Sequence, residues 1–250
     1  MTALITAEVG HGPDIVLLHG VGAGPDTFAE LATRLADGHR VLIIERPGGD
    51  GAVVPLANQA AAVADTMVTL GAVGGLVVGV SGGATLAVLL GVEHREVVGG
   101  LVAHEPLLGP LVPPLHECFA AAAERARRGE REAMEVVQSL LGSRTWQELD
   151  PSARARIAAG ASRARGEIPL FAGFSPTVEE LQSLHGLPLL TTVGERSDPA
   201  RFDVAAVLAA LAGAQLAVVP GAGNAVQLDA PAAFADAICA WWGASMCEAI

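Results

Sequence analysis

Short apolar runs rich in β-branched residues recur along the chain, each bounded by glycine or proline. Most are almost uniformly apolar, as expected of strands that are covered on both faces. They predict strands at residues 4–8, 14–18, 40–45, 75–80, 98–104, 188–193 and 215–219. Between them, apolar residues at helical spacing predict helices at 25–36, 58–70, 83–90, 200–211 and 231–242. This alternation predicts an α/β fold with a mainly parallel sheet of about seven strands.

The stretch from residue 109 to residue 186 breaks this alternation. It has helical patterns rich in arginine and glutamate, at 115–128, 130–141, 151–165 and 176–184, and no convincing strand. We therefore expect a helical cap at 109–186, inserted into an α/β core made of 1–108 and 187–250. At 250 residues with 51% hydrophobic content, the chain is large enough for one such domain with its insertion.

Composition narrows the classes of partner. The formal net charge is −12, and every basic residue is an arginine within an amphipathic stretch, not part of a patch. This argues against nucleic acid or an anionic membrane surface as a partner. Cys118, Cys239 and Cys247 have no metal-ligand spacing and cannot form a closed disulfide framework, so we expect a reduced, cytoplasmic setting. Residues 1–10 do not resemble a signal peptide, no apolar run is long enough to span a bilayer, and no metal or organic cofactor is implied.

A serine lies in the motif Gly79-Val80-Ser81-Gly82-Gly83, directly after a predicted buried strand and at the start of a predicted helix. Glycines around a serine in this context permit the sharp turn that exposes a nucleophile. A glycine-rich turn of a nucleotide-binding domain is the alternative. The chain has neither the GxGxxG pattern nor the lysine of a phosphate loop. The motif therefore predicts a nucleophile elbow.

A second glycine-rich loop, His19-Gly20-Val21-Gly22-Ala23-Gly24, follows the strand predicted at 14–18. Its backbone amides could point toward a developing oxyanion. A dinucleotide-binding loop is the alternative. It would need a third spaced glycine and a well-placed acidic residue, for which Glu45 at the end of the next strand is weak evidence.

The order of four motifs resembles the α/β-hydrolase superfamily: the HGxG loop, the GxSxG elbow, Gly194-Glu195-Arg196-Ser197-Asp198-Pro199, and Pro220-Gly221-Ala222-Gly223-Asn224. The resemblance covers the whole chain except the cap. It implies Ser81 as nucleophile, Asp198 as the acid, an oxyanion hole made by the amides of Val21 and Gly82, and Asn224 at the position of the base. Family members usually place two strands before the strand of the HGxG loop, whereas this chain has room for one.

Asn224 is the main departure from the family pattern, because an amide cannot accept and return a proton near neutral pH. One base change converts a histidine codon to an asparagine codon, so an introduced substitution and natural drift both explain it. Glu105 is an alternative acid, and Asp198 could instead cap the next helix. A substitute base would have to be His19, His104 or His116. The remaining histidines, His11, His39, His94 and His185, precede strands or lie in a hairpin loop.

Three functions remain open. The first is a serine hydrolase that cleaves an ester, thioester, lactone or amide and is weakened by Asn224. The second is a cofactor-free lyase, isomerase or cyclase in which Asn224 holds a carbonyl. The third is a ligand-binding module without chemistry. An apolar approach at the start of the cap predicts a hydrophobic small-molecule substrate. We expect substrate contacts from His19, Gly20, Gly22, Glu105, Leu108, Leu115, His116 and Phe119.

Overall fold

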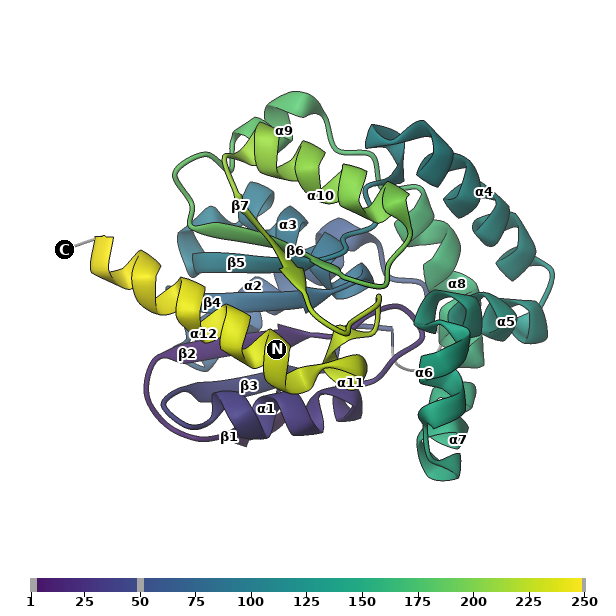
Figure 1. The fold of residues 1–250 in the computed structure, drawn as a ribbon, viewed down its shortest axis with the longest axis horizontal. Coiled ribbons are helices and arrows are strands. Elements are labelled where there is room, and N and C mark those ends of the chain that lie inside the picture. Colours follow the sequence, from purple (N-terminus) through teal and green to yellow (C-terminus); the bar gives the residue numbers. More distant parts are fainter. Residues whose placement is uncertain (1–3, 49–51, 249–250) are drawn as a thin grey trace.

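The structure, a computed structural model, describes residues 4–48 and 52–248 and contains one seven-stranded sheet (Figure 1). The strands are β1 (Ile5–Val9), β2 (Asp14–Leu18), β3 (Arg40–Ile44), β4 (Gly75–Val80), β5 (Val98–His104), β6 (Leu189–Gly194) and β7 (Gln215–Val219). They are ordered β1-β3-β2-β4-β5-β6-β7. The first strand runs antiparallel to β3, and the other pairs are parallel. The predicted mainly parallel sheet is confirmed, with β1, β3 and β6 differing from their expected bounds by one residue.

Helices cover both faces of the sheet. The core helices are α1 (Ala29–Leu35), α2 (Leu56–Thr69), α3 (Gly82–Glu93), α10 (Pro199–Ala212), α11 (Val226–Asp229) and α12 (Pro231–Glu248). In Figure 1, α1 and α12 lie in front of the sheet, and α2 and α3 lie behind it. The expected helix at 25–36 is divided into a 3₁₀ turn, Pro25–Phe28, and α1.

Side chains of the central strands point alternately to the two faces of the sheet, and this produces two hydrophobic cores. Ile15 and Leu17 of β2 belong to the core under α1 and α12, whereas Val16 and Leu18 belong to the core under α2, α3 and α10. All four side chains are fully buried. Successive side chains of a strand point to opposite faces, so a strand covered on both faces must be apolar at every position. This explains the uniformly apolar runs of the sequence.

Between β5 and β6 the chain forms a further set of helices. These are α4 (Pro113–Arg127), α5 (Glu130–Leu141), α6 (Ser143–Glu148), α7 (Pro151–Ala159), α8 (Ala161–Ala172) and α9 (Val178–Gln182). Of these, α4 to α8 lie at one end of the sheet and α9 lies beside α10 (Figure 1). We call α4 to α8 the cap. The expectation of one helix at 151–165 was wrong, because the chain turns at Gly160. A Cβ at Gly160 would lie 3.3 Å from the carbonyl oxygen of Gly22, so this turn packs closely on the loop after β2.

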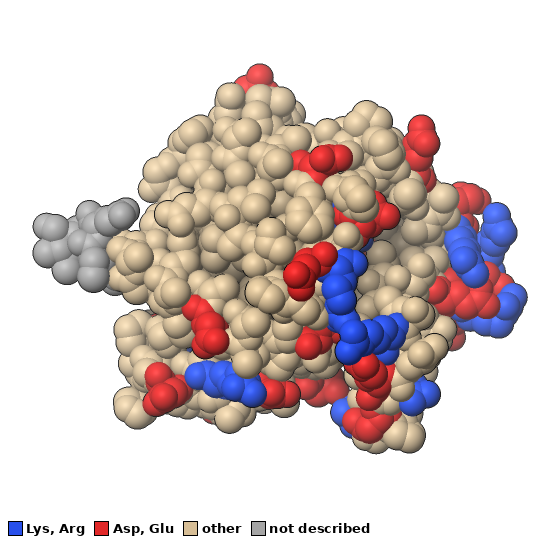
Figure 2. Space-filling view, in the orientation of Figure 1, with Lys and Arg blue, Asp and Glu red and all other residues tan. Residues whose placement is uncertain are grey.

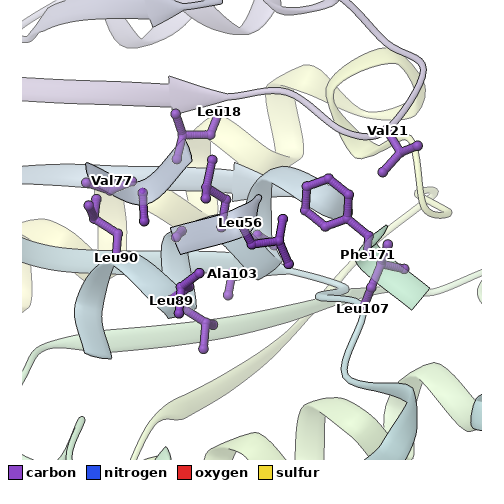
Figure 3. Packing of buried hydrophobic residues seen from close by; sticks show 14 of the residues in the cluster. Leu18, Val21, Leu56, Val77, Leu89, Leu90, Ala103, Leu107 and Phe171 are labelled. Carbon is purple, nitrogen blue, oxygen red and sulfur yellow. The ribbon is translucent and has the colours of Figure 1, made fainter. Parts of the chain in front are cut away.

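The cap and the core share one hydrophobic cluster. Phe171 of α8 is fully buried and belongs to the same cluster as Val21 and Leu107 of the core. Figure 3 shows its ring reaching toward the core beside these two residues. Burying an aromatic side chain at this junction stabilises the docking of the cap by roughly 2–3 kcal/mol. The cap is therefore packed against the core in this structure.

Charged side chains gather toward the cap end of the molecule in the face shown in Figure 2, with arginine and acidic residues interspersed. Pairs such as Arg131 with Glu135 and Arg144 with Glu148 join successive turns of the cap helices. Such exposed pairs contribute little to stability, because water and salt screen the charges. In the part of the chain that the structure describes, no helix combines the length and the apolar character needed to cross a membrane.

Candidate functional site

Ser81 lies at the sharp turn between β4 and α3. Its backbone has φ 54° and ψ −117°, a conformation that few residues other than glycine adopt. The surrounding glycines are required by contact: a Cβ at Gly83 would lie 1.9 Å from the carbonyl oxygen of Leu18, and one at Gly79 would lie 2.3 Å from that of Gly83. The local geometry is that of a strained strand-to-helix turn. Ser81 itself is buried, with 5% of the residue exposed.

Two backbone amides face the same region as Ser81. A Cβ at Gly82 would lie 3.2 Å from the amide nitrogen of Val21, and one at Gly20 would lie 3.3 Å from the Cβ of Ser81. The loop after β2 therefore lies directly against the serine turn. Neither the Val21 nor the Gly82 amide donates a hydrogen bond to an acceptor among the described residues. Two free amides beside a serine can stabilise an oxygen that acquires negative charge during a reaction, provided that both point at it.

A buried arginine holds the loop after β2 from behind. The Arg46 side chain is fully buried, and its Nε and Nη2 atoms donate to the carbonyl oxygens of His19 and Gly20 over 2.9 and 3.1 Å. Its guanidinium also forms a two-pronged ion pair with Glu167 of α8, with both N–O distances 2.9 Å. This arrangement ties the candidate oxyanion loop to the cap through one side chain. The role of Arg46 was not foreseen from the sequence.

Asn224 pairs with Glu105, not with Asp198. The Asn224 Nδ2 donates to Glu105 Oε2 over 3.0 Å. Asp198 instead caps α10 by accepting from the amide of Ala200 over 3.0 Å. The structure thus brings the alternative acid to the base position, and gives Asp198 the helix-capping contact that the Asp-Pro sequence also allowed.

Glu105 is a buried carboxylate surrounded by donors. It accepts from the amide of Gly194 over 3.0 Å and from the hydroxyl of Ser197, in addition to Asn224. Burial raises the pKa of this carboxyl, but the Arg201 guanidinium and the hydrogen bonds from Ser197 and Gly194 outweigh it and hold the pKa below its usual value. Glu105 therefore stays negatively charged near neutral pH.

The backbone of Glu105 is strained in the same way as that of Ser81. Its φ is 48°, and Ser81 and Glu105 are the only residues other than glycine with positive φ in the part of the chain described. The two turns are connected, since the amide of Ser81 donates to the carbonyl oxygen of His104 over 2.8 Å. Each such residue costs on the order of 1–3 kcal/mol and persists only where the fold enforces it. Both lie at the carboxyl ends of neighbouring strands.

The three histidines considered as substitute bases either bond to other groups or are exposed on the surface. His104 donates from Nε2 to the carbonyl oxygen of Gly223 over 3.0 Å, which leaves Nδ1 to accept from Thr192 over 2.9 Å. Burial lowers the pKa of His104, so the ring is neutral, and both of its nitrogens are engaged. His19 is fully buried with Nδ1 against the Gly20 carbonyl over 3.0 Å, and His116 is exposed on α4. None of the three makes a hydrogen bond to the Ser81 hydroxyl in the described structure.

Ser81 lines one small cavity, and two further cavities adjoin it. A cavity of about 20 Å³, lined by Ser81, Val21, Leu140, Leu141 and Asn224 among others, has room for about one water molecule. A second of about 20 Å³ is almost wholly apolar and shares Val21 and Leu140 with the first. The third, of about 350 Å³, shares Leu140, Leu141 and Asn224 with the first, and several charged side chains, among them Glu105 and Arg201, line it. The serine therefore lies between a small apolar compartment and a larger charged one.

The residues expected to contact the substrate lie in different parts of the structure, and only some of them line a cavity. Gly20 lines the cavity at Ser81, Glu105 lines the large cavity, and Phe119 lines the apolar one. Leu108 and Leu115 are buried in the main core, and they line none of these three cavities. At Gly22, with φ 67°, a Cβ would meet Val137 of α5 at 2.6 Å, so this glycine lets the cap approach the loop. No group of three metal-binding side chains occurs among the described residues.

Comparison with known proteins agrees with this geometry. The profile of a family described as "Alpha/beta hydrolase family" matches residues 15–237. The chain belongs to the alpha/beta hydrolase family. This match includes the Ser81 turn, the Glu105 turn and Asn224, and it confirms the family expected from the order of motifs.

Solved structures of alpha/beta hydrolases show the same fold. An esterase from Thermogutta terrifontis is 21% identical with a TM-score of 0.78, and the match covers 96% of this chain and 97% of that one. An enol-lactonase from Burkholderia xenovorans is 17% identical with a TM-score of 0.77 over 96% and 99% of the two chains. The carboxylesterase CesB from Bacillus subtilis is 21% identical with a TM-score of 0.75 over 96% and 89%. No curated protein sequence matches the chain.

Proposed function

We propose that this alpha/beta hydrolase is a serine hydrolase whose acyl-transfer site is weakened because Asn224 occupies the position of the general base. Ser81 is the nucleophile, and the amides of Val21 and Gly82 form the oxyanion hole. Glu105 takes the role of the acid that would orient a base. The observation that carries the proposal is the hydrogen bond from Asn224 to Glu105, because it places an amide where a hydrolase needs an imidazole.

The chemistry follows from this arrangement. Attack of the Ser81 oxygen on a carbonyl carbon creates a tetrahedral intermediate, whose oxyanion the two free amides would stabilise. The serine must lose its proton during the attack, and the leaving group must gain one. Asn224 can hydrogen-bond but can do neither. In serine hydrolases, loss of the base costs on the order of 10⁶-fold in turnover, and the remaining site still gives roughly 10³ to 10⁴ over water.

The carboxylate of Glu105 supports this role. It is buried and negatively charged, and hydrogen bonds from Gly194, Ser197 and Asn224 hold it in place. A neutral amide gains little from so strongly held a negative charge, whereas an imidazolium formed during catalysis would gain much more. The carboxylate that would orient a catalytic base is therefore already held in place, although Asn224 is not a base.

We place the acyl group of the substrate in the apolar compartment. This cavity is lined by Val21, Leu107, Phe119, Ala122, Leu140, Ile168 and Ala172. It shares Val21 with the cavity at Ser81, so an apolar acyl chain entering it would keep its carbonyl next to the candidate oxyanion hole. The substrate is then an ester, thioester, lactone or amide with an apolar acyl portion. At its present size the compartment requires movement of the cap for a longer chain.

Restoring the base tests the proposal. We expect Asn224→His to raise kcat/KM toward a p-nitrophenyl butyrate ester at least about 10²-fold, because a histidine there can bond Glu105 and reach the serine. The matched control carries both Asn224→His and Ser81→Ala and should return to the background rate. If Asn224→His folds with unchanged melting temperature but shows no gain, a hydrolytic role for this site is excluded.

A further inference from the structure

Arg201, in the first turn of α10, is a buried guanidinium without hydrogen bonds. Its side chain is only 9% exposed, and it makes no hydrogen bond with any described residue. The nearest carboxylate oxygen, Glu105 Oε2, lies 3.9 Å from its Nε. The guanidinium carbon lies 5.1 Å from the centre of the Phe119 ring, which supports the cation from below. The Nη1 atom is fully buried and has no hydrogen-bond partner among the described residues, although a guanidinium carries five N–H donors.

Buried donors without partners are costly, because they lose their hydrogen bonds to water and gain none in the protein. Most such groups in folded proteins are satisfied by the protein, by water or by a ligand. Arg201 lines the cavity of about 350 Å³, together with Glu105 and Asn224. It therefore lies where a ligand could supply the missing acceptors.

The acidic residues of this cavity are already committed. Asp229 accepts from the hydroxyl of Thr145 and the amide of Gly223, and it forms an ion pair with the guanidinium of Arg196 over 3.1 Å. Both oxygens of Glu105 accept hydrogen bonds, as described above, and Asp198 caps α10. These carboxylates leave the Nη1 donor of Arg201 without an acceptor, and a group with several acceptor oxygens would complement it. A carboxylate matches the planar fork of an arginine best.

We propose that the large cavity binds a carboxylate of the ligand through Arg201, so that the substrate is an ester or related acyl compound that carries a free carboxylate. This inference rests on the proposed function and specifies its substrate class. Asn224, Leu140 and Leu141 line both this cavity and the one at Ser81, so one small molecule can span the two. The carboxylate lies near Arg201, and the reacting carbonyl lies at Ser81.

Binding to a chain that cannot react tests this directly. Calorimetric titration of the Ser81→Ala protein compares methyl hydrogen glutarate, which carries one carboxylate, with neutral dimethyl glutarate. We expect the monoanion to bind at least tenfold more tightly than the diester. Arg201→Met should remove this preference and leave binding of the diester unchanged. Equal affinity of the two probes for the Ser81→Ala protein, or a preference that survives Arg201→Met, would overturn the inference.

Two further variants separate ligand binding from a structural role. Arg201→Lys keeps a cation beside Glu105 but lacks the fork, so we expect the preference to fall several-fold with little change in melting temperature. It also keeps the test valid if Arg201→Met does not fold, and an unaltered preference in Arg201→Lys would then count against the inference. Arg34→Met on exposed α1 makes the same change of net charge and should leave the preference intact.

The titration requires no turnover, so its outcome is independent of the hydrolase proposal. If Asn224→His gains no activity but the monoanion preference depends on Arg201, the carboxylate site stands and the acyl-transfer role fails. If Asn224→His gains activity and both probes bind equally, the acyl-transfer role stands and the carboxylate site fails. Activity of the Asn224→His protein on p-nitrophenyl hemiglutarate and p-nitrophenyl butyrate provides a second readout, with the ratio of kcat/KM values expected to favour the hemiglutarate.

Discussion

The Nη2 atom of Arg46 donates a hydrogen bond to the carbonyl oxygen of Gly20 over 3.1 Å. A trans peptide unit is planar, and its C=O and N–H bonds point in opposite directions. Fixing the Gly20 carbonyl therefore fixes the direction of the Val21 N–H, which belongs to the same peptide unit. That N–H points away from Arg46, on the side where Gly82 lies. Arg46 is thus a positioning residue for the proposed oxyanion hole.

Arg46→Lys should lower turnover more than it lowers affinity. A lysine keeps a cation near Glu167, but one ammonium group cannot reach His19, Gly20 and Glu167 together. In the Asn224→His protein we expect kcat to fall about 10- to 100-fold with KM nearly unchanged, which is less than the roughly 10²–10³ lost with a complete oxyanion donor. Arg34→Lys, an exposed change of the same kind, should have no effect. A lower melting temperature with kcat intact would reduce Arg46 to a purely structural role.

The identity of the acid can be decided by two isosteric changes in the Asn224→His protein. Glu105→Gln removes the negative charge beside position 224, and we expect kcat to fall at least about 10²-fold because the imidazolium loses its partner. Asp198→Asn should leave kcat within about twofold, since asparagine also caps a helix well. Steady-state kinetics on a p-nitrophenyl ester provides the measurement. The opposite ranking of the two variants would return the role to Asp198.

The sequence predicted the architecture because the relevant signals are local. Uniformly apolar strands, the glycines around Ser81 and the order of four motifs each depend on neighbouring residues, and the sheet and family expected from them are confirmed. The break at Gly160 escaped prediction, and in the structure Gly160 packs against Gly22, which is far away in the sequence. The periodicity of 151–165 carries no information about that contact.

The pairing of Asn224 was harder to predict for the same reason. Asp198 and Glu105 both follow strands, so the sequence places both near the carboxyl end of the sheet. What separates them is the positive φ of Glu105, together with the donors from Gly194, Ser197 and Asn224 that hold its carboxylate. Arg46 and Arg201 were also missed. A polar residue directly after a buried strand was the available signal for Arg46, whereas the sequence around Arg201 resembles any amphipathic helix.

Gly83→Ala should disrupt the serine turn. Its Cβ would lie 1.9 Å from the Leu18 carbonyl oxygen, and backbone atoms on both sides leave no flexible side chain to move aside. We expect a loss of about 3 kcal/mol or more in the free energy of unfolding, measured by chemical denaturation. Gly243→Ala is the matched control, because Gly243 is an exposed residue of α12 and nothing lies within 4 Å of the added Cβ. It should stabilise the protein by about 0.5–1 kcal/mol. Equal stability of the two variants would contradict the close contact.

Glu45 connects the end of β3 to the cap, and it should make stability depend on acid pH. Burial raises the pKa of this carboxyl, but contacts with His19 and Arg163 outweigh it and lower the pKa to about 2. A lowered pKa means that the folded state holds the proton less tightly than the unfolded chain does. The stabilisation is therefore complete above the ordinary value near 4.5 and is lost as the pH falls toward 2.

Glu45→Gln should therefore cost stability at pH 6 and cost much less near pH 2.5. The Glu45 side chain is 37% exposed, so solvent screens its ion pair and we expect a difference of no more than about 1 kcal/mol at pH 6. Urea unfolding at the two pH values measures the change. Glu30→Gln removes an exposed acid of α1 that pairs with Arg34, and its curve should stay close to that of the unmodified protein at both. A Glu45→Gln effect that is the same at pH 6 and pH 2.5 would show that the contact acts through packing and not through charge.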